Sequence, residues 1–195
     1  MRIALCICPQ WSVQTPSFAI GSLKSHIKNK DVEVEQFDLN IRTSLYTKEK
    51  NIEKFWDWGN DTPWNSESNF KEEILPNFKD LWHEYIDKLA EYDVVAFTTY
   101  ISNIVTTDYI ARYIKQKNPK IQIWYGGPYS WYAECAGLVE SDNYREFVDV
   151  ACSSTDGEKI ISELVNRYME DGHYENVKGI YRWDKMTPSF PTVLK

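Results

Sequence analysis

Short apolar runs alternate along this chain with longer stretches in which apolar residues recur at helical spacing. Residues 94–97 are an unbroken apolar run, headed by Asp93, with no alternation of polar and apolar positions. Such a run is typical of a strand buried on both faces of a sheet. Apolar residues then fall at helical spacing over 104–116, and a second apolar strand pattern covers 121–125. The sequence therefore predicts a strand–helix–strand unit with parallel strands.

The same alternation extends over most of the chain. Strand patterns occupy 3–7, 32–37, 94–97, 121–125, 147–151 and 177–183, and helical patterns occupy 16–27, 39–46, 78–92, 104–116, 131–139 and 157–171. Segment 32–37 alternates apolar and charged residues, which indicates a strand near a sheet edge. The predicted fold class is α/β: a Rossmann-like or flavodoxin-like open parallel sheet of five strands with helices on both faces, a candidate edge strand and a helical insert. We assign 1–187 to one α/β domain and 188–195 to a tail or linker.

The insert, at about 48–91, is the longest connection between predicted strands. Up to residue 76 it is irregular and carries Trp56, Trp58 and Trp64 among polar residues, whereas 78–92 has the wide apolar stripe of a helix. A long connection without periodicity is often a functional lid or a surface for a partner.

Composition and charge argue against several classes of function. The 195 residues carry a net charge of −7 without a lysine or arginine cluster, so we expect no nucleic-acid partner. No apolar run approaches the roughly 20 residues that span a bilayer, so we expect no membrane partner. The four cysteines lack the paired CxxC spacing of a zinc site: Cys6, Cys8, Cys135 and Cys152. We interpret them as buried, reduced thiols of a cytoplasmic protein.

Polar and glycine-rich breaks follow the two central strands. Hydroxyls and an aromatic follow the first strand, and a glycine pair follows the second: Thr98, Thr99, Tyr100 and Ser102, then Gly126, Gly127 and Pro128. In open α/β sheets, ligands bind outside the carboxyl ends of the strands. Each break alone also fits a structural role, because hydroxyls cap helices and a glycine pair makes a tight turn. Together, the two breaks predict a binding groove between adjacent strand tips.

No catalytic motif accompanies this groove. A flavin- or nucleotide-binding enzyme would need a phosphate loop, and the sequence has neither GxGxxG after the first strand nor GxxxxGK[ST] anywhere. Residues 156–158 open a helix, where capping is commoner than ligand contact. The histidines share no motif with an acidic partner and are interpreted as surface residues: His26, His83 and His173. We therefore assign no catalytic residue and no metal ligand from the protein.

Six segments, in their order along the chain, carry a family resemblance. They are CPQWSVQTP, FDLN, YDVVAFTTYISN, IWYGGP, VDVACSSTDGEKIISEL and GIYRWD. Over nearly the whole length, the chain resembles the cobalamin-binding domain at the N-terminus of cobalamin-dependent radical S-adenosylmethionine enzymes. No single segment is diagnostic, but their order and spacing together are fairly specific.

The resemblance departs from the wider cobalamin-binding family at the cobalt ligand. That family carries Asp-x-His-x-x-Gly after strand two, Ser-x-Leu after strand three and Gly-Gly after strand four. Here Asp38 is kept, Asn40 stands at the histidine position and Thr43 at the glycine position, while 98–100 read Thr-Thr-Tyr and Gly-Gly is retained at 126–127. An asparagine amide is a poor cobalt ligand. The resemblance thus implies base-off cobalamin without a histidine lower ligand.

The resemblance also implies which residues bind the cofactor. It places near the corrin ring Gln10, Trp11, Ser12, Asn40 and Ile41. It places Thr98 and Tyr100 beside the nucleotide tail, with Gly126, Gly127 and Pro128 giving the tail room and Ser154, Gly157 and Glu158 at its far wall. The remaining cofactor-binding residues that it implies are Asp38, Thr99 and Ser102.

The implied function is to supply cobalamin, as methylcobalamin or hydroxocobalamin, to a radical S-adenosylmethionine methyltransferase or a related enzyme. The chain has no CxxxCxxC triplet for an iron–sulfur cluster, so the radical step is expected from another domain or subunit. The alternative is a flavodoxin-like protein-interaction domain that has lost cobalamin binding and uses 48–76 as its surface. Exposure of the tryptophans in that segment would favour this alternative.

Overall fold

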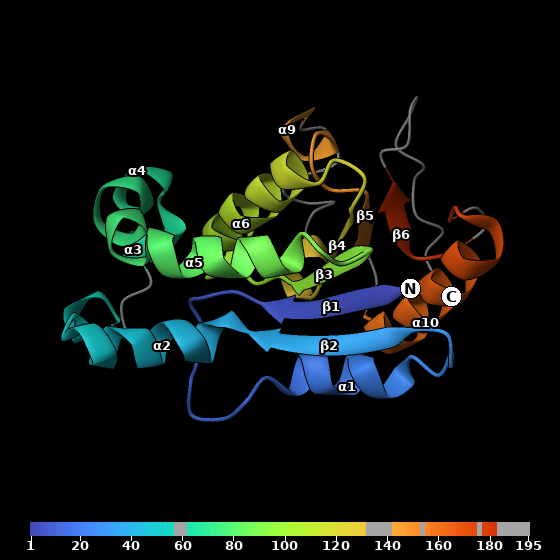
Figure 1. The fold of residues 1–195 in the computed structure, drawn as a ribbon, viewed down its shortest axis with the longest axis horizontal. Coiled ribbons are helices and arrows are strands. Elements are labelled where there is room, and N and C mark those ends of the chain that lie inside the picture. Colours follow the sequence, from blue (N-terminus) through green and yellow to red (C-terminus); the bar gives the residue numbers. More distant parts are fainter. Residues whose placement is uncertain (57–61, 132–141, 153–154, 175–176, 183–195) are drawn as a thin grey trace.

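The computed structural model describes residues 1–56, 62–131, 142–152, 155–174 and 177–182. Its centre is a six-stranded sheet in the order β2-β1-β3-β4-β5-β6 (Figure 1). The strands are β1 (Arg2–Ile7), β2 (Glu33–Asp38), β3 (Val94–Thr98), β4 (Gln122–Gly126), β5 (Val150–Cys152) and β6 (Ile180–Arg182). Strands β1 to β5 pair in parallel, and β6 pairs antiparallel with β5. The predicted open sheet, with its added edge strand, is confirmed.

Helices cover both faces of the sheet (Figure 1). The helices are α1 (Phe18–His26), α2 (Leu39–Lys50), α3 (Thr62–Asn65), α4 (Glu67–Asn69), α5 (Leu75–Leu89), α6 (Ile104–Lys117), α7 (Pro128–Trp131), α9 (Asp142–Arg145) and α10 (Gly157–Asp171), with a 3₁₀ turn at Glu53–Phe55 and a π-helical turn at Phe70–Ile74. Alternate strand residues, such as Leu5 and Trp124, pack with α1 and α10. Their neighbours, such as Cys6 and Tyr125, pack with α5 and α6. This double coverage is why β3 is buried along its whole length.

Several predicted boundaries shift in the structure. Strand β5 begins at Val150 rather than at 147, because the backbone N–H groups of Phe147 and Val148 both donate to the carbonyl of Tyr144 and turn the chain there. Helix α7 begins at Pro128, and residues 132–139 of the helix predicted there lie outside the described residues. Three of the four cysteines, Cys6, Cys8 and Cys152, are buried as expected, and Cys135 lies outside the described residues.

The insert is more regular than the sequence predicts. Helix α2 continues to Lys50, and residues 62–74 wind through α3, α4 and the π-helical turn into α5. Trp64 is 1% exposed, and its ring lies 5.6 Å from that of Phe78 and 6.3 Å from that of Trp82. Contacts between aromatic rings from distant turns order this segment, and such contacts leave no periodic signal in the sequence.

The two tryptophans of the insert that the structure describes, Trp56 and Trp64, pack against each other rather than forming an exposed surface. Trp56 is half-buried with its ring 5.4 Å from that of the buried Trp64, and Trp58 lies outside the described residues. The two that are described therefore do not form the exposed patch that the protein-interaction alternative requires. No helix in the described part of the chain is long and apolar enough to cross a membrane.

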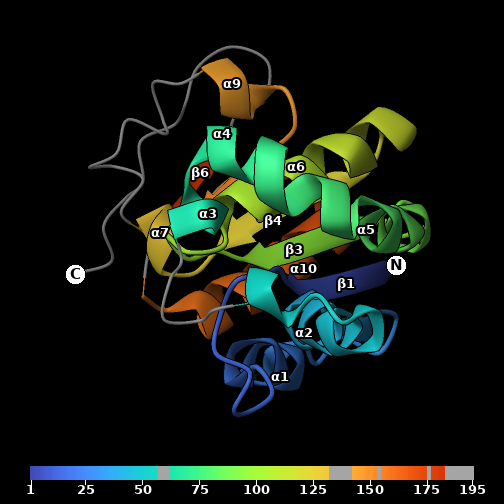
Figure 2. The same ribbon diagram turned by 90° about the vertical axis from the view of Figure 1, so that its left-hand side faces the viewer.

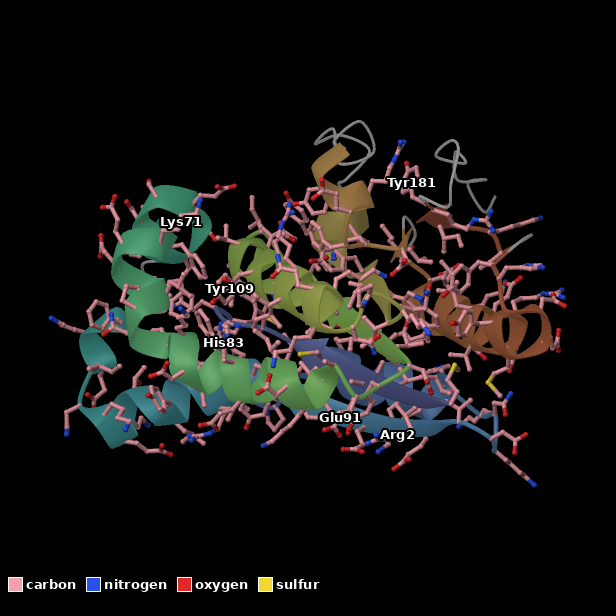
Figure 3. The ribbon with its side chains drawn as sticks, turned by 45° about the horizontal axis from the view of Figure 1, so that its top comes forward. Arg2, Lys71, His83, Glu91, Tyr109 and Tyr181 are labelled. Atoms are coloured by element: carbon pink, nitrogen blue, oxygen red, sulfur yellow. The ribbon has the colours of Figure 1, made fainter. Side chains whose placement is uncertain are left out.

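One histidine differs from the surface position predicted for it. His83 of α5 is half-buried and shares a hydrogen bond of 2.9 Å with the Tyr109 hydroxyl of α6, a pair visible where the two helices pack in Figure 3. His26 and His173 are exposed, as predicted.

A buried carboxylate joins three elements beside the central strands. Asp108 of α6 accepts hydrogen bonds from the hydroxyl of Tyr125 in β4, at 2.9 Å, and from that of Tyr144 in α9, at 2.8 Å. Burial raises the pKa of Asp108 to about 6, although both tyrosine donors act in the opposite direction. A carboxyl whose pKa is higher in the folded than in the unfolded chain stabilises the fold when protonated, and this contribution is lost as the pH rises through the folded pKa.

This linkage gives a prediction for Asp108→Asn. Between pH 4 and pH 7 the wild-type chain should lose ~2 kcal/mol of unfolding free energy relative to the variant, since one pKa unit corresponds to ~1.4 kcal/mol and the unfolded carboxyl is already partly ionised at pH 4. Urea unfolding of both proteins at the two pH values measures the difference, and the same substitution at the exposed Asp80 serves as the control. Parallel pH profiles for wild type and Asp108→Asn would contradict the role given to Asp108.

Candidate functional site

The carboxyl ends of β1, β2 and β3 lie side by side, at the point where the strand order reverses direction across the sheet. Strand β1 lies between β2 and β3, and Ile7 near its end pairs with Asp38 on one side and Thr98 on the other. The chain passes from β1 to β2 on one side and then crosses to β3 on the other side, so the segments that follow β1 and β3 run in different directions from this edge. Such a topological switch point is where open α/β sheets bind ligands. Figure 2 looks onto this edge of the sheet.

The first turn of α2 fixes the loop that follows β1. Asn40 is 2% exposed; its Oδ1 accepts a hydrogen bond from the Trp11 backbone N–H at 2.8 Å, and its Nδ2 donates to the Ser12 carbonyl at 3.2 Å. Both halves of the amide are thus engaged with the loop. Asn40 is therefore a tether between α2 and this loop.

Asp38 supports the same arrangement. Its Oδ1 accepts from the backbone N–H of Ile41 at 2.9 Å, which caps α2, and its Oδ2 accepts from the backbone N–H of Ser17 at 3.3 Å. A carboxylate is favoured at a helix N-terminus because it pairs there with unsatisfied N–H groups and with the helix dipole. The FDLN segment therefore holds both ends of the loop after β1.

The hydroxyls after β3 bond to backbone rather than to an open groove. Thr99 is fully buried, and its Oγ1 donates to the Gly126 carbonyl at 2.8 Å. The Ser102 Oγ donates to the Gln10 carbonyl at 2.8 Å, and Thr98 is 4% exposed. These side chains tie the neighbouring strand tips together.

The glycine pair after β4 divides into two roles. Gly127 has a φ of +96°, and a Cβ there would lie 2.7 Å from the Thr99 carbonyl oxygen, so this position requires glycine for the close approach of two loops. A Cβ on Gly126 would meet only the Cys152 Cβ, at 3.8 Å, and the Phe97 carbonyl oxygen, at 4.0 Å. The tight-turn interpretation therefore accounts for Gly127 but not for Gly126.

A cleft of about 330 Å³ opens at the switch point between the loops after β1 and β3. Its wall includes Trp11 and Tyr100, whose rings are stacked with centroids 4.2 Å apart and planes 18° from parallel. Burial raises the pKa of the Tyr100 phenol, so its hydroxyl stays protonated at neutral pH. The cleft is lined by Ile7, Trp11, Ser12, Thr15, Pro16, Ser17, Phe18, Ala19, Asp38, Asn40, Tyr100 and Glu158. Its volume falls in the range of small-molecule sites, about 300 to 1,000 Å³.

Large apolar side chains are exposed on the loops around this cleft. Phe18 is 85% exposed, Ile101 72% and Trp11 39%. Grouped apolar exposure at one edge of a sheet marks a surface that a ligand or partner covers.

A second, narrower space adjoins the cleft. This slot, of about 60 Å³, lies between the sheet and α10 and is lined by Leu23, Ala96, Phe97, Trp124, Tyr125, Gly126, Gly127, Cys152, Gly157, Ile160, Ile161 and Leu164. Gly157 lines the slot and the next residue, Glu158, lines the cleft, so the two spaces are neighbours. The Glu158 Oε1 accepts from the Ser22 Oγ at 2.9 Å and joins α10 to α1 at this boundary. The slot is too small in this form for a nucleotide, and admitting one requires α10 to move outward.

The residues predicted for the site are divided among these spaces. The cleft collects Trp11, Ser12, Asp38, Asn40, Tyr100 and Glu158, and the slot collects Gly126, Gly127 and Gly157. Six others line neither: Gln10, Ile41, Thr98, Thr99, Ser102 and Pro128. Ser154 lies outside the described residues.

Sequence reasoning missed Phe18 and the neighbouring residues 15–19, although their place at the start of the first helix, just after the loop that follows strand one, was a usable signal. It also missed the slot's helix wall, Ile160, Ile161 and Leu164. An apolar helix face looks the same in the sequence whether it packs fully or borders a narrow space.

Comparisons with known proteins complete the description. No protein-family model matches the chain, and no curated protein matches its sequence. Its fold does match two solved structures of TsrM, a radical S-adenosylmethionine methyltransferase from Kitasatospora setae: one with tryptophan substrate and a S-adenosylmethionine analogue (aza-SAM) bound, the other with cobalamin and a [4Fe-4S] cluster bound. Each superposes on 96% of this chain with a TM-score of 0.58 and 16% sequence identity. This chain spans 29% and 30% of the two TsrM chains, and at this identity the similarity establishes a shared fold.

Proposed function

We propose that this chain is a cobalamin-binding domain that holds the cofactor base-off, without a histidine lower ligand, for a radical S-adenosylmethionine methyltransferase domain or subunit. The observation that carries the proposal is the pair of adjoining spaces at the switch point. An open cleft with an aromatic wall suits the flat corrin ring, and the narrow apolar slot beneath Gly126 would receive the nucleotide tail when α10 moves outward. When bound, cobalamin would supply a cobalt centre able to carry a methyl group.

The donor set agrees with this assignment. Asn40 is engaged with the loop backbone on both sides of its amide, and no imidazole stands at its position. The described residues contain no group of three or more His, Cys, Asp or Glu that could hold a metal ion by themselves.

The shared fold supports the proposal in a second way. One TsrM structure of this fold contains cobalamin, and this chain corresponds to less than a third of that protein. Such a proportion suits one domain of a larger enzyme. The chemistry of methyl transfer would then belong to a linked or associated radical domain.

The first prediction concerns retention of the cofactor. The purified chain, incubated with excess hydroxocobalamin and desalted, should keep a stoichiometric cobalamin absorption spectrum of the base-off type. The flavodoxin-like interaction domain would instead return a colourless protein. Loss of the absorbance on desalting would overturn the proposed function.

The second prediction separates the two spaces. Gly126→Leu places a side chain at the slot, so binding of cobalamin should weaken at least tenfold, whereas cobinamide, which lacks the nucleotide tail, should bind as it does to wild type. Titrations followed by absorbance measure both affinities, and Gly21→Leu, on exposed α1, is the matched control. Equal weakening for both corrinoids would show that the slot does not receive the tail.

A further inference from the structure

We infer that Asn40 is a positioning residue: its amide holds Trp11 stacked on Tyr100, and this aromatic pair is the wall against which the corrin ring rests. The inference depends on the proposed function for the identity of the ring. The positioning itself is a property of the chain alone and can be measured without a ligand.

The side chain of Asn40 satisfies two backbone groups of the loop after β1. The loop offers Asn40 one backbone donor, the Trp11 N–H, and one backbone acceptor, the Ser12 carbonyl, and the amide satisfies both from a buried position. A carboxylate can satisfy only the donor, and an apolar side chain of the same shape satisfies neither. A buried backbone group left without its partner costs more than the bond contributes when made, so the loop would move.

A second buried asparagine, Asn103, holds the backbone of Tyr100. Asn103 is fully buried; its Oδ1 accepts from the Tyr100 backbone N–H at 2.7 Å, and its Nδ2 donates to the carbonyls of Cys8 and Thr98 at 3.3 and 3.1 Å. Each of the two loops therefore has one ring and one buried asparagine that fixes the ring's backbone. The stack across the switch point results from two tethered loops rather than from chance contact of surface side chains.

The stacked rings of Trp11 and Tyr100 form a flat, apolar wall of the cleft. Trp11 remains 39% exposed although it is stacked, and both rings line the cleft. An exposed tryptophan on an untethered loop would sample several rotamers, and a ligand would have to order it on binding. A preformed, flat, apolar wall suits a flat macrocycle and lowers that ordering cost.

It follows that residue 40 acts on the wall and not on the metal. Introducing histidine at this position would release Trp11, because an imidazole ring does not reproduce the reach of the amide to both backbone groups. In this chain the side chain at the family's ligand position shapes the pocket instead.

The test is a double-mutant cycle on hydroxocobalamin binding by the full chain. Asn40→Leu should weaken binding about tenfold and Trp11→Leu about thirtyfold, while Asn40→Asp, which keeps the acceptor for the Trp11 N–H, should weaken it about threefold. The double variant Asn40→Leu/Trp11→Leu should bind within twofold of Trp11→Leu alone, because Asn40 acts through Trp11. Additive losses in the double variant would overturn the inference.

A second measurement, on the unliganded protein, keeps the two claims separate. Hydrogen exchange in peptides covering 9–18 should become at least tenfold faster in Asn40→Leu and stay unchanged in Ser44→Ala, a buried control four residues along α2. Unchanged exchange in Asn40→Leu would overturn the positioning role. A third outcome combines faster exchange in Asn40→Leu with a wild-type chain that does not retain cobalamin. That outcome would leave Asn40 as the tether but overturn the corrinoid wall together with the proposed function.

Discussion

The parallel pairing of β1 with both β2 and β3 is the constraint on which the site depends. Because Ile7 pairs with Asp38 and with Thr98, the residues that follow all three strands are delivered to one place. The loops after β1 and β3 each carry an aromatic ring, Trp11 and Tyr100. The residues after β2 begin α2, which carries Asn40. A shift of register by one residue in β2 would turn Asn40 away from the loop, since successive side chains point to opposite faces.

Polar side chains at this edge serve the backbone before they serve a ligand. Asn40, Asp38, Thr99 and Ser102 all bond to main-chain groups of neighbouring loops. What remains for a ligand is an aromatic wall, exposed rings at the rim, several polar side chains of the cleft and a glycine-lined slot. A large flat ring with apolar faces and a polar periphery matches such a surface better than a bare metal ion, which would need a set of free ligating atoms.

Much of the fold could be predicted from the sequence. The unbroken run at 94–97 and the alternation at 32–37 report directly whether one or both faces of a strand are covered, so β3 and β2 were placed correctly. The helix at 78–92 was predicted from its apolar stripe, but the first part of the insert, up to residue 76, could not be, because Trp64 is ordered by contacts with Phe78 and Trp82 that leave no period in the sequence. At the site, the strand-end rule located the switch point, but it could not tell that Gly127 is required by the Thr99 backbone whereas Gly126 faces the slot. Nor could it show that Asn40 fixes the backbone of Trp11, because the two residues lie 29 positions apart along the chain.

The central claim is that cobalt at this site has no nitrogen ligand on its lower face, because residue 40 is committed to the loop and the tail lies away from the metal. Electron paramagnetic resonance of the protein loaded with cob(II)alamin tests this most directly, since an axial nitrogen splits the cobalt lines into triplets. The account predicts a cob(II)alamin signal that belongs to the protein and shows no nitrogen splitting. A triplet-split signal from protein-bound cobalamin would contradict it.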